Sequence, residues 1–113
     1  MSFEFHALNA AFAVAPQLTA DDIAAVAAAG FRSVINNRPD LEGGPEQPLN
    51  AGIAAAAAAQ GLQYAWLPVV PSDITAQDVA RMKALVAELP APVLAFCRSG
   101  ARAAKLYQMA TEG

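Results

Sequence analysis

Short strand-like stretches alternate with longer helix-like stretches along this chain, and this alternation constrains the fold more than any other feature. The predicted strands, rich in apolar and β-branched residues, are 31–36, 62–69 and 92–96. The predicted helices, with apolar residues at helical spacing, are 19–30, 50–61, 75–89 and one from about Arg102. Two short apolar stretches within 3–14 are expected to pair as further strands. Such alternation predicts a three-layer α/β fold, with a central, mostly parallel sheet flanked by helices.

Residues at the ends of the predicted helices support this assignment. Thr19 and Thr75 are suitable N-caps, and Asp78 follows Thr75 at the spacing of a capping box. Gly30 and Pro90 are residues that commonly end a helix. The boundaries of the first and third predicted helices therefore rest on local signals as well as on apolar spacing.

The composition excludes several kinds of partner and site. A formal charge of −3 provides no basic surface for nucleic acid, and no apolar run reaches the ~18 to 20 residues that a membrane helix needs. A single cysteine allows neither an internal disulfide nor a multi-cysteine metal site, and we expect no metal and no cofactor. A free thiol fits the cytoplasm, where we expect this protein to be found. The length of 113 residues predicts one domain over 1–113.

The stretch CRSGAR lies between the last predicted strand and the last predicted helix, and it begins with the only cysteine, Cys97. Ligands of parallel sheets bind at the carboxyl ends of the strands, where this loop is expected. In a tight turn, successive N–H groups form an anion-binding nest, to which the helix dipole adds. Ser99, Gly100 and Ala101 are small enough for an anion to approach the main chain, and Arg102 can hold two oxygens with its planar fork. Because positive potential favours the thiolate, Cys97 is predicted to be a nucleophile.

A lone cysteine also has a simpler interpretation. Free cysteine is often buried and inert, and Cys97 could be a small core residue at the end of a strand. We favour the nucleophile because the five residues that follow Cys97 all suit an anion-binding loop.

The same stretch resembles the active-site loop of rhodanese-type sulfurtransferases and, more loosely, that of cysteine-dependent protein phosphatases. The wider chain resembles the beta-lactamase-hydrolase-like protein phosphatase-like domain family. The stretches that carry this resemblance are APQLTADDIAAVAAAGFRSVINNRPDLEG, the QP at 47 and 48, GLQYAWLPV and PVLAFCRSGARA. The resemblance implies a fold similar to that of dual-specificity phosphatases. It also implies a partner, because some members are fused to a metallo-beta-lactamase-like persulfide dioxygenase.

Two departures from the phosphatase pattern bear on the reaction. Phosphatases usually have histidine before the nucleophilic cysteine, where this chain has Phe96, and they have one residue more between cysteine and arginine than the stretch Arg98 to Ala101 provides. The shorter Cys-x4-Arg spacing is that of rhodaneses. A phosphoryl group needs a larger ring of donors than a sulfane sulfur does, so the loop favours a sulfurtransferase on a protein-tyrosine-phosphatase-like fold. A phosphatase that forms a phosphocysteine is the alternative, and a non-catalytic anion-binding module is a further one.

Three other charged residues are candidates for the same site. The resemblance implies that Asp73 is a general acid of the phosphatase kind, although a solvated or helix-capping aspartate is an equal alternative. Arg38 follows the strand 31–36 and either adds positive charge for an anion or pairs with Asp40, and we favour the pairing or loop-ordering role. Arg98 either selects a small anionic substrate, such as thiosulfate, glutathione persulfide or a phosphate ester, or is solvated.

Overall fold

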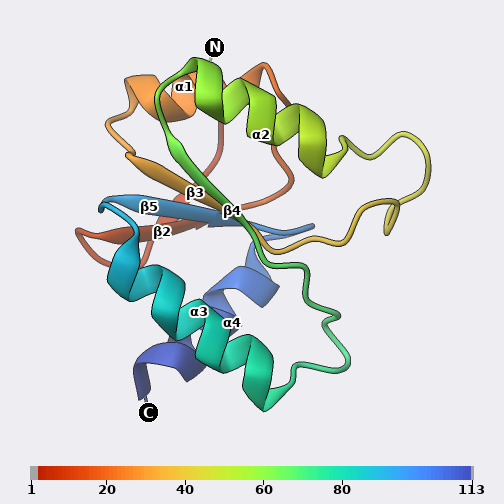
Figure 1. Cartoon of the computed structure of the whole chain (residues 1–113), viewed down its shortest axis with the longest axis vertical. Helices are drawn as coiled ribbons and strands as arrows, with labels where there is room; N and C mark the ends of the chain where they lie inside the picture. Colours follow the sequence, from red (N-terminus) through yellow and green to blue (C-terminus); the bar gives the residue numbers. More distant parts are fainter. Residues whose placement is uncertain (1–2, 113) are drawn as a thin grey trace.

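A five-stranded sheet lies between two pairs of helices in the computed structural model, which describes residues 3–112 (Figure 1). The elements in chain order are β1 (His6–Ala7), β2 (Phe12–Ala15), α1 (Asp22–Ala28), β3 (Ser33–Asn36), α2 (Asn50–Ala59), β4 (Gln63–Trp66), α3 (Ala76–Glu88), β5 (Val93–Phe96) and α4 (Ala101–Glu112). Helices α1 and α2 cover one face of the sheet, and α3 and α4 cover the other (Figure 1). The predicted α/β fold is confirmed.

The strands are ordered β1-β2-β5-β3-β4 across the sheet. The pair β1 and β2 is antiparallel, whereas β2, β5, β3 and β4 all run parallel. Ala15 and Asn36 both stand opposite Phe96, so β2 and β3 end level with β5. The loop that follows β5 therefore begins at the centre of the sheet's carboxyl edge.

Alternate residues of the central strands enter two separate cores. In β5, Val93 and Ala95 face the core beneath α3 and α4, and Cys97 continues this series just beyond the strand. Leu94 and Phe96 face the core beneath α1 and α2. All four residues of β2, β3 and β5 are buried, as expected of parallel strands that are covered on both faces.

Two predicted boundaries differ from the observed ones for physical reasons. Strand β4 ends at Trp66, because the regular ladder is lost beyond it: the N–H groups of Leu67 and Val69, two residues apart, donate to the adjacent carbonyls of Asn36 and Asn37. Helix α1 begins at Asp22 rather than at Thr19. The Thr19 N–H donates to Asp22 Oδ2 at 2.8 Å and the Asp22 N–H donates to Thr19 Oγ1 at 3.3 Å, so Thr19 closes a turn before the helix. Of the helices in residues 3–112, none is long and apolar enough to cross a membrane.

Candidate active site

The segments that follow the parallel strands meet at the carboxyl edge of the sheet. The Asn37 N–H, after β3, donates to Phe96 O at 2.9 Å. The Val69 N–H, beyond β4, donates to the Asn37 carbonyl at 3.1 Å. The Gln17 N–H, after β2, donates to Arg98 O at 3.2 Å. The loop after β5 and the loop after β3 therefore lie side by side, as the sequence predicts.

Cys97 lies at the base of the loop between β5 and α4, and the main chain of this loop turns back toward its sulfur. The N–H of Gly100 donates to Cys97 Sγ at 3.1 Å. Gly100 has φ +95°, a left-handed conformation that favours glycine, and an added Cβ would lie 3.4 Å from the main chain of Ala15. Helix α4 begins at the next residue, so its amino end and the Gly100 N–H both place partial positive charge near the sulfur.

Cys97 borders both a hydrophobic core and a cavity. Cys97 is 1% exposed and belongs to the core beneath α3 and α4. It also lines a cavity of about 360 Å³ whose walls come from the loop, α4 and the chain before α3. These lining residues are Pro71, Ile74, Cys97, Arg98, Ser99, Ala101, Arg102 and Lys105. The cavity therefore brings Cys97 together with two arginines and a lysine.

Arg102 points into the protein, but its fork already has a partner. Its side chain is 8% exposed, and its Nη1 and Nη2 donate to Glu42 Oε2 at 3.1 Å and Oε1 at 2.9 Å. Nη1 also lies 3.0 Å from the Val69 carbonyl and 3.4 Å from that of Asn37. The Nε is buried and has no hydrogen-bond partner among residues 3–112. Arg102 thus lines the same cavity as Cys97, and its terminal nitrogens are held by a carboxylate of the protein itself.

Glu42 is the residue of this site that the sequence analysis missed. Arg38 is 7% exposed, and its Nε donates to Glu42 Oε1 at 2.9 Å. The expected pair of Arg38 with Asp40 is therefore wrong, because Asp40 Oδ1 instead accepts the N–H of Asn50 at 2.7 Å, at the start of α2. An acidic residue four positions after Arg38 was the only local signal for the observed pair.

The two arginines change the acidity of Glu42. Partial burial, the largest single influence, would raise the pKa of its carboxyl above the ordinary value of 4.5. Hydrogen bonds from Arg102 and Arg38, together with the charges of both guanidinium groups, outweigh burial and lower this pKa. Glu42 is therefore ionised at neutral pH.

Leu41 and Gly43, which flank Glu42 in the loop after β3, both have unusual local geometry. Leu41 has φ +65°, a left-handed conformation that is strained for a leucine, although its side chain is exposed. At Gly43, an added Cβ would lie 2.6 Å from Arg38 Nη2. A residue with a Cβ at this position would require the Arg38 guanidinium, the end of a flexible side chain, to shift.

Arg98 lines two neighbouring cavities at this edge. Besides the cavity at Cys97, it lines one of about 730 Å³ together with Arg38, Glu42, Gly43, Val70, Pro71, Ser72 and Arg102. Three arginines against one carboxylate give this second cavity an excess of positive charge. The predicted anion-binding residues Arg38, Arg98 and Arg102 are thus brought together, whereas Ser99 and Ala101 line the cavity at Cys97 but not this second one.

Asp73 is exposed on the segment between β4 and α3, and its N–H donates to Val70 O at 3.0 Å. It lines neither of the two cavities, although Ser72 and Ile74 on either side of it do. The N-cap of α3 is Thr75, so Asp73 is not the cap of this helix. The structure thus gives Asp73 neither contact with the loop nor a capping role.

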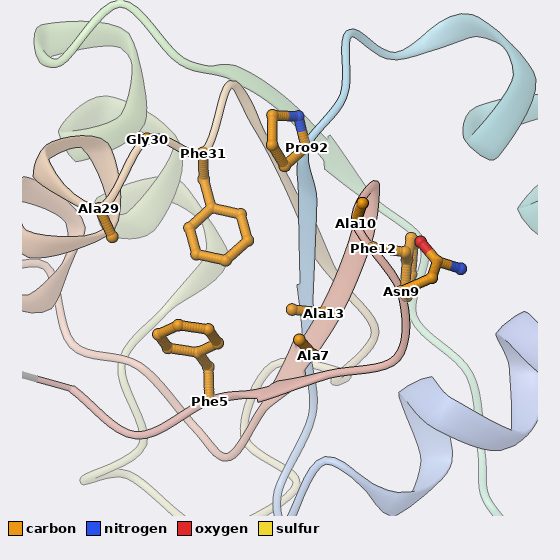
Figure 2. A pocket seen from close by; sticks show the side chains of 10 residues that line it. All are labelled: Phe5, Ala7, Asn9, Ala10, Phe12, Ala13, Ala29, Gly30, Phe31 and Pro92. Carbon is orange, nitrogen blue, oxygen red and sulfur yellow. The ribbon is translucent and has the colours of Figure 1, made fainter.

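Two further hollows lie outside this arrangement. His6 lines one of about 330 Å³ on the β1 side of the loop, together with Ser99 and Gly100, and Cys97 is not among the residues that line it. Figure 2 shows the other, an apolar pocket of about 250 Å³ in which the rings of Phe5 and Phe31 stand edge to face, 5.3 Å apart. No group of three or more His, Cys, Asp or Glu residues within the described range is placed to hold a metal ion.

Residues 4–113 match the family described as "Beta-lactamase hydrolase-like protein, phosphatase-like domain". Among curated proteins, the chain is 39% identical over 100 residues to a beta-lactamase hydrolase-like protein of Agrobacterium fabrum (strain C58), and 38% identical over 102 residues to one of Xylella fastidiosa (strain Temecula1). These matches cover 88% and 90% of this chain but 23% of each relative. The chain therefore spans less than a quarter of the length of these relatives.

Solved structures are similar to this one as well. The crystal structure of a "putative phosphatase (nma1982)" from Neisseria meningitidis Z2491 has a TM-score of 0.84 and 34% sequence identity, over 95% of this chain and 77% of that chain. The core catalytic domain of the PP-IP phosphatase SIW14 from Saccharomyces cerevisiae has a TM-score of 0.67 over 88% of this chain and 59% of that chain. At 12% identity, the yeast enzyme is similar in fold alone.

Proposed function

The chain belongs to the family of the phosphatase-like domain of beta-lactamase hydrolase-like proteins, and from this premise we propose that it is an enzyme with Cys97 as its nucleophile. The observation that carries the proposal is the 3.1 Å contact between the Gly100 N–H and Cys97 Sγ. A main-chain donor and the amino end of a helix stabilise a thiolate, which is the reactive form of cysteine. Cys97 also lines a cavity of about 360 Å³, a volume that suits a small reactant.

We favour transfer of a sulfane sulfur as the reaction. In the first step the Cys97 thiolate attacks the outer sulfur of a donor such as thiosulfate or an organic persulfide. A bond forms between the two sulfurs, the sulfur–sulfur bond of the donor breaks, and sulfite or a thiolate leaves with the electron pair. In the second step cyanide or an acceptor thiolate attacks the outer sulfur of the Cys97 persulfide, and the Cys97 thiolate leaves. Neither step requires a general acid, which is consistent with the exposed position of Asp73.

The ion pair of Arg102 with Glu42 supports sulfur transfer over phosphoryl transfer. Transfer of a phosphoryl group requires donors for three oxygens, and a guanidinium fork is the usual source of two of them. Here Glu42 binds the fork formed by Nη1 and Nη2 of Arg102, and only Nε is left without a partner in the part of the chain that the structure describes. A persulfide on Cys97 needs only the main-chain N–H groups of the loop, and these are not bound to Glu42.

Phosphate ester hydrolysis is the second candidate, and the similarity to the Neisseria protein favours it. In that reaction the Cys97 thiolate would attack phosphorus, the alcohol would leave with a proton, and water would then hydrolyse the phosphocysteine. Asp73 would have to move into the cavity to supply the proton, and Glu42 would have to release Arg102. The proposal of sulfur transfer requires neither change.

Mass spectrometry of the protein after treatment with thiosulfate, and separately with glutathione persulfide, tests the proposal. We expect one sulfur atom added to Cys97, removal of that atom by cyanide, and no addition in Cys97→Ser. Turnover of an aryl phosphate without persulfidation would favour the phosphatase instead, and Asp73→Asn would then show whether Asp73 is the acid. If neither reaction is observed, the remaining candidate is a non-catalytic anion-binding module.

The partner that the family suggests is a further part of the proposal. The relatives are more than four times as long as the matched region, so in them this domain is joined to other sequence. We propose that a metallo-beta-lactamase-like persulfide dioxygenase consumes or supplies the sulfur that Cys97 carries.

A further inference from the structure

Glu42 occupies the position that an anionic ligand of Arg102 would take. Its two oxygens lie 3.1 and 2.9 Å from Nη1 and Nη2 of Arg102, which is the two-pronged contact that a carboxylate or phosphate ligand makes. The Glu42 side chain is 24% exposed and the Arg102 side chain only 8%, so the carboxylate covers the guanidinium from the solvent side.

The rest of the loop keeps Glu42 in this position. Arg38 binds the same Oε1 at 2.9 Å and is itself held by Gln17, whose Oε1 accepts from Arg38 Nη1 at 3.1 Å. The left-handed Leu41 and the tightly packed Gly43 fix the backbone on either side of Glu42. A strained residue next to a charged contact indicates that the loop is organised for this contact.

A tetrahedral dianion would have to compete with this arrangement. Sulfate, thiosulfate and phosphate esters carry two negative charges and would be repelled by the ionised Glu42 while it holds the arginine fork. A sulfane-sulfur donor with one negative charge or none is repelled less by Glu42. It also does not require the Arg102 fork, because its outer sulfur needs only the main-chain donors around Cys97.

We propose that Glu42 is a specificity-determining residue: by holding both terminal nitrogens of Arg102 it weakens the binding of tetrahedral dianions at the Cys97 loop and so favours singly charged or neutral sulfur donors, such as organic persulfides, over thiosulfate. The choice among sulfur donors rests on the proposed function, whereas the weakened binding of dianions does not. Glu42 acts through Arg102 and takes no part in bond making or breaking.

Titration with sulfate, followed by the backbone amide signals of Ser99, Gly100 and Ala101 in ¹⁵N–¹H spectra, tests the proposal without any turnover. We expect Glu42→Gln to bind sulfate on the order of tenfold more tightly than the wild type, because the fork of a charged arginine becomes available to the dianion. Glu46→Gln is the matched control, since it removes the same charge from the same loop but has no ion pair with the arginines. It should bind sulfate as the wild type does.

A gain of affinity is a result that damage to the fold does not produce. Equal sulfate affinity in the wild type and Glu42→Gln, or no binding by either, would overturn the proposal. If the spectrum of Glu42→Gln shows that the variant is unfolded, Glu42→Ala and Glu42→Asp replace it. Glu42→Ala should then bind sulfate more tightly than Glu42→Asp, which keeps the charge, and the reverse order would overturn the proposal.

Persulfidation adds an independent measurement. The wild type should gain sulfur from glutathione persulfide faster than from thiosulfate, and Glu42→Gln should narrow this difference by raising the rate with thiosulfate. If no donor modifies Cys97, sulfur transfer fails as the function, but the sulfate titration still decides the role of Glu42.

Discussion

Gly100 sets the geometry of the candidate nucleophile at the scale of single residues. Its N–H is the donor that reaches Cys97 Sγ, and this requires a left-handed backbone at φ +95°. An added Cβ at this position would lie 3.4 Å from the carbonyl carbon and oxygen of Ala15, a contact that is close but does not overlap. Any other residue at this position is therefore strained mainly through its backbone.

Gly100→Ala is expected to slow the reaction of Cys97. The substitution should cost on the order of 1–2 kcal/mol of stability, because an L-residue resists this backbone angle. It should also move the Gly100 N–H away from the sulfur and lower the rate of persulfidation or alkylation of Cys97. Gly30→Ala is the control, because Gly30 has φ +99° with no atom within 4 Å of an added Cβ and follows α1. Equal rates for the two variants would show that the Gly100 contact does not matter for reactivity.

The ionised state of Glu42 gives a second prediction at this scale. Its pKa is lowered in the folded state, so its ion pairs stabilise the protein above the ordinary value of 4.5 and this contribution is lost as pH falls through the lowered pKa. Denaturant unfolding at pH values from 7 to 3 should show the wild type losing stability relative to Glu42→Gln, with most of the loss below pH 4.5. A constant difference between the two proteins across this range would contradict the assignment.

The residues of the site were only partly predictable from the sequence. Cys97, Gly100 and Arg102 belong to one continuous stretch, CRSGAR, and this stretch indicates an anion-binding loop. The pair of Arg102 and Glu42 joins residues 60 positions apart, and no local pattern indicates such a contact. Arg38 was assigned the wrong partner because Asp40 is nearer in the sequence but is used at the start of α2.

At the scale of elements, Tyr64 connects β4 to its neighbours at the carboxyl edge of the sheet. Its hydroxyl donates to Asn50 Oδ1, at the first residue of α2, and accepts from Asn36 Nδ2 at the end of β3. Asn36 Oδ1 in turn accepts the N–H of Arg38 at 2.9 Å. The position of the Arg38 main chain therefore depends on a strand, a helix and one phenol.

Burial raises the pKa of Tyr64 to about 12, against a smaller opposite influence of the Asn36 hydrogen bond and a small further increase from the charge of Asp40. Because the pKa is raised in the folded state, the associated stability is complete below pH 10 and is lost as pH rises from 10 towards 12. The absorbance of tyrosinate in the wild type minus that in Tyr64→Phe should therefore rise near pH 12. A midpoint near 10 would mean that the hydroxyl is accessible to water.

Elements with local signals were the ones predicted well. The capping box of α3 is present as expected, with the Asp78 N–H and Thr75 Oγ1 3.0 Å apart and the Thr75 N–H and Asp78 Oδ2 also 3.0 Å apart. Strand 62–69 was predicted too long because apolar residues continue past Trp66. Leu67 and Val69 still donate to the carbonyls of Asn36 and Asn37, but these acceptors are adjacent whereas a regular ladder would place them two residues apart.

At the scale of the whole molecule, the sheet is shared by two cores. Met82, Leu106 and Ala103 pack on one face and Ile23, Ile53 and Val26 on the other, all of them almost fully buried. The alternation of strands and helices was sufficient to predict this arrangement, because a parallel sheet has to be covered on both faces. The positive charge of the carboxyl edge follows from the same topology, because Arg98 and Arg102 follow β5, Arg38 follows β3, and these two parallel strands are neighbours.

The strands β2, β5 and β3 supply residues to both cores. Loss of packing in one core therefore also exposes the strands that form the other core. We therefore expect residues 1–113 to unfold as one cooperative unit, with the fluorescence of Trp66 and the far-ultraviolet circular dichroism changing at the same denaturant concentration. Ile53→Ala and Leu106→Ala, one in each core, should each cost ~2–5 kcal/mol. Both should lower the midpoint while the two signals stay coincident. If Ile53→Ala separated the fluorescence transition from the dichroism transition, the α1 and α2 layer would unfold independently. The site at the shared edge would then be held by the β5 and α4 side alone.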